Sequence, residues 1–131
     1  MKNRWVSFAG LCLTVMCTAL IVLFSLEASE KVPTVAGWLP FSDKVGHFLA
    51  YAALGFSLGL WRRPRHSYIS EALTYALVLG VGLELIQPFF GRTRSGGDVI
   101  ADLLGAIWGL YCLYIARRLA SSLWKKENSM N

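Results

Sequence analysis

The 131-residue chain is 55% hydrophobic and only 16% charged, and it carries a formal net charge of +5. A soluble domain is about a quarter charged, and a chain this short has too little interior to hide so much apolar surface from water. The basic residues stand at the ends of apolar runs rather than in a stripe with interleaved aromatic residues, so they indicate membrane topology and exclude a nucleic-acid partner. We therefore expect a single membrane domain over residues 1–131.

The first apolar run covers about residues 5–26 and contains no charged residue. A helix of this length can cross about 30 Å of hydrocarbon. A cleaved signal peptide is the alternative, but the apolar core of a signal peptide has about 7–15 residues. Ala28 also offers only a poor cleavage position. The sequence therefore favours a retained transmembrane helix.

Three more helices are predicted, at about residues 45–61, 68–90 and 98–116. Pro88 marks the exit of the third helix, because proline lacks the backbone N–H that a helix needs. Arg117 and Arg118 are expected to end the fourth, with a frayed tail after them. No segment shows the alternation that strands require. The predicted fold class is all-α: a polytopic membrane protein with four transmembrane helices in a compact bundle.

The loops between these helices alternate in charge. With four helices, nine basic residues fall on the side of the two termini: Lys2, Arg4, Arg62, Arg63, Arg65, Arg117, Arg118, Lys125 and Lys126. The other side has four, namely Lys31, Lys44, Arg92 and Arg94. The positive-inside rule then predicts that both termini lie in the cytoplasm.

Two G-x-x-x-G motifs, Gly55/Gly59 and Gly105/Gly109, fall inside the predicted helices. In lipid, this spacing lets two helices pack closely. The motif is short and does not identify its partner. It therefore leaves a homo-oligomer through either glycine pair open.

The cysteines and histidines do not form a recognisable metal or redox motif. Cys12, Cys17 and Cys112 all fall inside apolar runs, at spacings that match no zinc site. Two histidines are too few for a metal cluster. We expect no disulfide, no metal and no cofactor.

The ionisable residues inside the predicted helices gather at one depth. His47 lies one turn beyond Asp43 and Asp102 one turn beyond Asp98, each about 6 Å along the helix. Glu84 is about 9 Å from the end of its helix. A charge below the membrane surface costs about 2.5–3.5 kcal/mol, so such groups normally face protein or water. Three helices with ionisable groups at matching depth predict one shared polar pocket on the extracytoplasmic side.

Other polar residues complete the expected site. Gln87 is expected to hydrogen-bond with Glu84. Arg92 and Arg94 lie in a glycine-rich loop, where their guanidinium groups can clamp a phosphate or carboxylate over the mouth of the pocket. The predicted ligand-binding residues are Asp43, Lys44, His47, Glu84, Gln87, Arg92, Arg94, Asp98 and Asp102, and the candidates for catalysis are His47, Glu84 and Asp102.

Several of these residues also have a purely structural explanation. A helix cap is the simpler role for Asp98, and an ion pair with Arg92 or Arg94 is an alternative for Glu84. A fully buried ion pair is a poor source of stability, which favours a functional role for Glu84. Asp102 is a stronger site candidate, because capping does not explain it.

The polar residues form four motifs in a fixed order: Asp43-Lys44-x-x-His47-Phe48-x-x-Tyr51-x-x-x-Gly55, Glu84-x-x-Gln87, Arg92 or Arg94, and Asp98-x-x-x-Asp102-x-x-Gly105. In this order and spacing they resemble the VanZ-like membrane proteins, over roughly half the chain. The family usually has Asn where this chain has Asp102, a change that can alter the preferred charge of a ligand. The resemblance implies a multi-pass protein of the bacterial inner membrane, linked to the cell envelope and to tolerance of the glycopeptide antibiotic teicoplanin.

Three functions fit these observations, and whether the protein is an enzyme is left open. The first is a protein that binds an envelope component, either a lipid head group or a lipid-linked precursor. The second is a membrane enzyme that acts on a lipid-linked phosphate or glycan, although no nucleophile motif supports it. The third is a small lipid or proton-coupled transporter, for which four helices make a small unit without an inverted repeat. The first is the predicted function.

Overall fold

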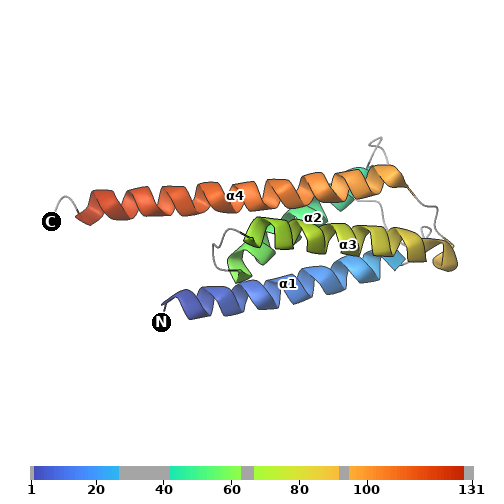
Figure 1. Ribbon diagram of the computed structural model, residues 1–131, viewed down its shortest axis with the longest axis horizontal. Coiled ribbons are helices and arrows are strands. Elements are labelled where there is room, and N and C mark those ends of the chain that lie inside the picture. The colour runs from blue at the N-terminus through green and yellow to red at the C-terminus, as the bar shows by residue number, and fades with distance from the viewer. Residues whose placement is uncertain (1, 27–41, 63–66, 92–94, 129–131) are drawn as a thin grey trace.

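The computed structural model describes residues 2–26, 42–62, 67–91 and 95–128, and this part of the chain contains no strand. Its elements are α1 (Lys2–Leu26), α2 (Ser42–Trp61), α3 (Tyr68–Ile86), the 3-10 turn η1 (Gln87–Phe90) and α4 (Gly96–Asn128). Figure 1 shows the helices side by side, with both termini at the same end and α4 extending past the others. The all-α prediction is confirmed.

The surface of the helices is suited to lipid. Large apolar side chains are exposed on them, among them Trp5, Val78 and Trp108, and so much exposed apolar surface is rare on a soluble monomer. By length and composition, three helices can cross a membrane: Arg4–Leu26, Tyr68–Phe90 and Gly96–Lys126. These helices are therefore typical of a membrane protein.

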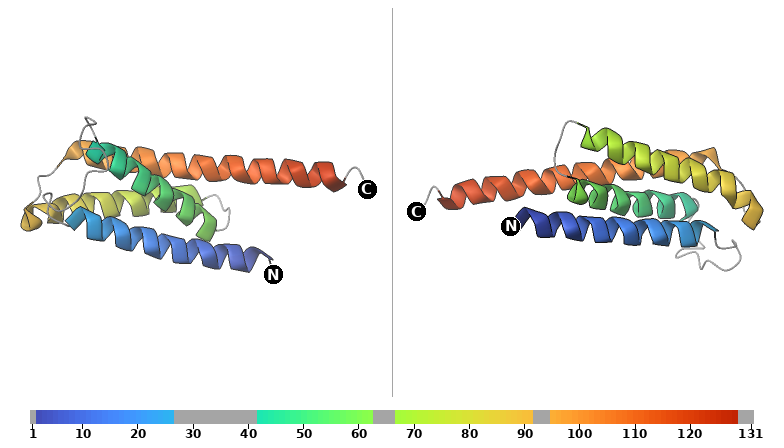
Figure 2. Two further views of the ribbon diagram at one scale, coloured as in Figure 1. Left: turned by 180° about the vertical axis from the view of Figure 1, so that it is seen from behind. Right: turned by 60° about the horizontal axis from the view of Figure 1, so that its bottom comes forward.

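Helix α2 is not among the candidate spans, so four spans are not confirmed. Polar residues including Lys44 and His47 stand near its start and lower its mean hydropathy. It also packs against all three other α-helices, as the views in Figure 2 show for α1 and α4. Of these two polar side chains, His47 is 13% exposed and thus largely covered by protein, whereas Lys44 is 41% exposed.

Two helix ends differ from the prediction. The α-helical part of the third helix ends at Ile86, and the chain continues as the 3-10 turn η1, which contains Pro88 and is followed by Gly91 at φ 77°. Helix α4 does not end near residue 116 with a frayed tail, as predicted, but continues to Asn128. The added residues include no proline or glycine and several good helix formers, so the arginine pair does not stop the helix.

Helices α2 and α4 run in the same direction, and glycines set the distance between them. Gly105 lies against the backbone of Phe48, and Gly109 lies against the backbone of Ala52. A side chain at either glycine would collide with the neighbouring helix. The glycine faces are thus used within one chain. A homo-oligomer through them stays a prediction, and it would have to replace this contact.

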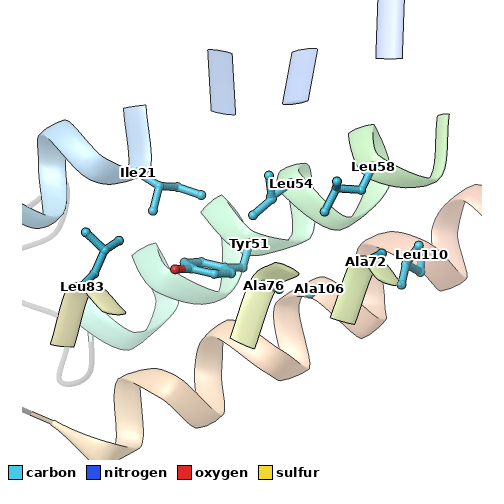
Figure 3. Close-up of a cluster of buried hydrophobic side chains, with 9 residues drawn as sticks. All are labelled: Ile21, Tyr51, Leu54, Leu58, Ala72, Ala76, Leu83, Ala106 and Leu110. Carbon is cyan, nitrogen blue, oxygen red and sulfur yellow. The ribbon is translucent and has the colours of Figure 1, made fainter. Parts of the chain in front are cut away.

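The buried core surrounds α2. Figure 3 shows Tyr51 and Leu54 of α2 between Ile21 of α1, Ala76 of α3 and Ala106 of α4. The alanines are small, so α3 and α4 approach α2 closely. The first turns of α2 are therefore held in a fixed position against α4, where the polar residues lie.

We predict that Gly55→Ala separates α2 from α4. A Cβ on Gly55 would overlap the backbone of Ala106, whose carbonyl carbon would lie 2.9 Å away. Overpacking of this kind costs about 1–3 kcal/mol. The measurement is thermal unfolding of the purified protein in detergent.

Gly46→Ala is the matched control, because Gly46 lies on the same helix and the structure places nothing described within 4 Å of its Cβ position. This change should leave stability unchanged or raise it by about 0.5–1 kcal/mol. Equal losses in the two variants would contradict the proposed role of the glycine contact.

Candidate functional site

A polar cluster forms at the end of the bundle opposite the termini, where α2 and α4 begin and α3 ends (Figure 1). It consists of Lys44, His47, Glu84, Ser95, Asp98 and Asp102. The predicted meeting of ionisable groups from three helices is therefore found. The carboxylate residues are buried, with Glu84 7%, Asp98 4% and Asp102 2% exposed. The described carboxylates are thus packed against their hydrogen-bond partners, and the pocket beneath Arg92 and Arg94 stays a prediction.

Asp98 is the centre of the first half of the cluster. Its Oδ1 accepts a hydrogen bond from Lys44 Nζ at 2.7 Å and another from Ser95 Oγ at 3.0 Å. Lys44 Nζ also donates to Ser95 Oγ at 3.2 Å. A Cβ on Gly97 would lie 2.9 Å from Lys44 Nζ, so this glycine makes room for the ammonium group. Asp98 therefore anchors α2 to the first turn of α4, beyond the cap role considered from the sequence.

His47 lies between the two aspartates of α4. Its Nδ1 is 2.9 Å from Asp102 Oδ1, and its Nε2 is 3.8 Å from Asp98 Oδ2. The aspartates are four residues apart and therefore share one face of the helix. A neutral imidazole has one N–H to donate, whereas a protonated ring has two. The arrangement suits a group that gains or loses a proton in place.

Glu84 ties α3 to the segment that leads into α4. Its Oε2 accepts a hydrogen bond from the backbone N–H of Ser95 at 2.7 Å, whereas its Oε1 has no hydrogen-bond partner in the described part of the chain. The sequence predicted a hydrogen bond between Gln87 and Glu84, but Gln87 pairs with another residue. Its Nε2 donates to the carbonyl of Ser25 on α1 at 3.3 Å.

Tyr51 and Gly80 complete the floor of the cluster. The Tyr51 side chain is almost fully buried, and its hydroxyl group interacts with the Asp102 carboxylate. A Cβ on Gly80 would lie 2.7 Å from Asp102 Oδ2 and 3.5 Å from Tyr51 Oη. The absent side chain of Gly80 therefore leaves space for the Asp102 carboxylate beside the tyrosine.

Sequence reasoning did not assign Ser95, Gly80 or Gly97 to the site. One signal was present for Gly80, which stands one turn before Glu84 and so shares its helix face. Arg92, Arg94 and the side chain of Asp43 lie outside the described residues, and their predicted roles stay predictions. The described cluster contains three carboxylates but only one lysine and one histidine.

Comparison with known proteins gives one family match. The family model described as VanZ/LLP1 matches residues 11–117. The matched range contains the polar cluster and parts of all four α-helices. No curated protein and no solved structure matches the chain.

We predict that Lys44 and Asp98 are energetically coupled. Lys44→Gln leaves a buried carboxylate without its cation, and Asp98→Asn removes the charge that Lys44 neutralises. Because contacting residues couple by about 0.5–3 kcal/mol, the double variant should lose less stability than the two single variants together. Unfolding of the four proteins in detergent measures this coupling.

The pair Arg62 and Glu71 provides a control cycle. These side chains are 3.2 Å apart and 48% and 44% exposed, and an exposed pair is worth about 0.2–1 kcal/mol at most. Substitution of both by Gln should give a smaller coupling. Equal coupling in the two cycles would show that the Lys44–Asp98 contact behaves as an ordinary surface pair.

Proposed function

The chain is a member of the VanZ/LLP1 family, and we propose that it binds an envelope component, a lipid head group or a lipid-linked precursor, at the polar cluster. The observation that carries the proposal is a buried polar atom, Glu84 Oε1, that lacks a hydrogen-bond partner within the described residues. Such atoms are rare in native proteins, and each costs about 1–3 kcal/mol. A ligand that donates a hydrogen bond to this carboxylate oxygen would remove the cost.

The charge of the cluster favours a particular kind of ligand group. Within the described cluster, carboxylates outnumber cations, so ammonium or hydroxyl groups suit its interior. Arg92 and Arg94 remain the residues proposed to hold a phosphate. A head group with a phosphate and either an amine or sugar hydroxyls would use both features. Asp102, in place of the usual Asn, adds negative charge that favours hydrogen-bond donors.

We also propose that the cluster faces outward from a bacterial inner membrane, with both termini in the cytoplasm. The end of the bundle that carries the termini is rich in basic residues, which supports this orientation. In the described part of the chain they are Lys2, Arg4, Arg62, Arg117, Arg118, Lys125 and Lys126. From this position the protein would act in envelope physiology or glycopeptide tolerance.

We predict that Glu84→Gln weakens selective binding of lipid head groups or lipid-linked precursors. Purified wild-type protein should bind one member of such a panel selectively. A hydrogen bond to a charged group is worth about 1.5–3 kcal/mol, so the variant should bind at least about tenfold more weakly. Arg94→Ala should weaken the same binding if the ligand carries a phosphate.

Glu71→Gln is the control for Glu84→Gln. It removes the same charge from the same helix, but Glu71 is exposed at the other end of the bundle. It should leave binding unchanged. A wild-type protein without selective binding, or a Glu84→Gln protein that loses thermal stability but keeps its binding, would contradict the proposal.

Catalysis on a lipid-linked phosphate or glycan is a second candidate function, favoured by one contact. Asp102 lies 2.9 Å from His47 Nδ1 and can orient the imidazole for acid–base work. Ser95 is near, but its hydroxyl group contacts Lys44, which forms an ion pair with Asp98 and therefore acts as a charged donor, not as a base. The cluster thus offers acid–base groups without an activated nucleophile.

If the protein is an enzyme, His47→Gln should abolish turnover of lipid-linked phosphates or glycans, because the general acid–base group is lost. Such groups contribute about 10²–10⁴-fold to the rate. Ser95→Ala should retain turnover if water is the nucleophile. Phosphate release or product chromatography with the purified protein provides the measurement, and absence of turnover by the wild type would reject this candidate.

A further inference from the structure

A groove lies between α3 and α4, near the end of the bundle that carries the termini. Its volume is about 250 Å³, and it is lined by three tyrosines, Tyr68, Tyr111 and Tyr114, and by aliphatic residues that include Leu73 and Ile107. Figure 1 shows the start of α3, in green, beside the middle of α4. Several lining residues are about half exposed. The groove is therefore an apolar surface feature separate from the polar cluster.

The size of the groove fits a single hydrocarbon chain. Pockets for drug-sized ligands have about 300–1,000 Å³, so this groove is small for a ring system. From Ile107 to Tyr114 it extends about 10 Å along α4, and Arg118 lies about 6 Å farther. One half of a bilayer core is about 15 Å thick. The groove and Arg118 together thus span roughly the depth of one leaflet.

A cation stands at the mouth of the groove. Arg118 Nη1 donates to Tyr114 Oη at 3.4 Å, and this is its one side-chain hydrogen bond within the described residues. A guanidinium group has five N–H donors and matches the geometry of a phosphate. The neighbouring arginines are engaged, since Arg62 pairs with Glu71 and Arg117 donates to the carbonyl of Gly59. Arg118 is therefore the residue placed to hold an anion beside the groove.

We propose that this groove binds one anionic phospholipid of the surrounding leaflet, with an acyl chain along Ile107 and Tyr111 and the phosphate at Arg118. Tyrosine is favoured at the depth where head groups meet hydrocarbon, which fits the three tyrosines of the lining. A second copy of the chain is a poorer occupant, because it would bring an equally basic end against this one. The lipid offers the complementary charge.

Native mass spectrometry tests the proposal with purified protein and an equimolar mixture of phosphatidylglycerol and phosphatidylcholine. The wild type should retain one phosphatidylglycerol molecule in preference. Arg118→Gln should reduce this preference about fivefold, because one basic residue at an anionic surface contributes about that factor. Ile107→Trp fills the groove and should abolish retention.

Each variant has a matched control on α4. Lys125→Gln removes one exposed positive charge away from the groove, and Leu104→Trp enlarges an exposed apolar residue outside it. Both controls should retain the lipid. If Arg118→Gln and Lys125→Gln reduce the preference for phosphatidylglycerol equally, the attraction comes from the overall positive charge, and the proposed site is overturned. A wild-type protein that shows no preference for phosphatidylglycerol would also overturn it.

Light scattering of the same proteins decides between lipid and a second copy. A wild-type dimer that Ile107→Trp converts to a monomer would show that another chain fills the groove, and would overturn the proposal. If the wild type and the Ile107→Trp protein have the same oligomeric mass, the result supports a lipid as the occupant of the groove. Because Arg118 is exposed, its substitution also tests the site if Ile107→Trp proves unstable in thermal unfolding.

Discussion

The close contact between α2 and α4 determines where the polar residues lie. Gly105 and Gly109 let the backbone of α4 rest on that of α2, which fixes both the distance and the register of the two helices. Lipid tails are as apolar as the helices, so tight packing of this kind is a main source of helix association in a membrane. A slip of one turn, about 5.4 Å, would remove His47 from Asp102. The contact that holds the fold therefore also assembles the site.

The cluster is an expensive way to join helices. Each charge at membrane depth costs about 2.5–3.5 kcal/mol on insertion scales. Lys44, Ser95 and His47 compensate Asp98 and Asp102, but the described residues leave one oxygen of Glu84 unsatisfied. Apolar residues of similar volume often stabilise a buried site as well as an ion pair does. The cost is easier to explain by a ligand than by helix packing alone.

Much of this arrangement could be predicted from the sequence, because the rise of a helix fixes the depth of each residue. His47, Glu84 and Asp102 were expected at one depth, and they are found in one cluster. Depth does not determine which side chains touch, since packing sets the rotation of each helix about its axis. The pairing of Gln87 with α1 depends on that rotation, and the contribution of Ser95 depends on the segment just before α4.

The length of α4 illustrates a different limit. A pair of arginines marks where an apolar segment meets polar surroundings, but it does not end a helix, since arginine is a good helix former. The arginine pair therefore predicts where the apolar segment ends, but it does not predict where the helix ends. Two properties of a membrane helix, its hydrophobic span and its hydrogen-bonded length, are set by different residues and need separate arguments.

Residue size along α3 and α4 explains why the two ends of the bundle differ. At one end, Gly80 has no side chain, so α3 approaches the Asp102 carboxylate and closes the polar cluster. At the other end, Tyr68 and Tyr111 line a groove between the same helices. Small residues permit close approach in lipid, whereas large ones hold helices apart. Helices α3 and α4 thus contribute to the polar cluster, together with α2, at one end and line an apolar groove at the other.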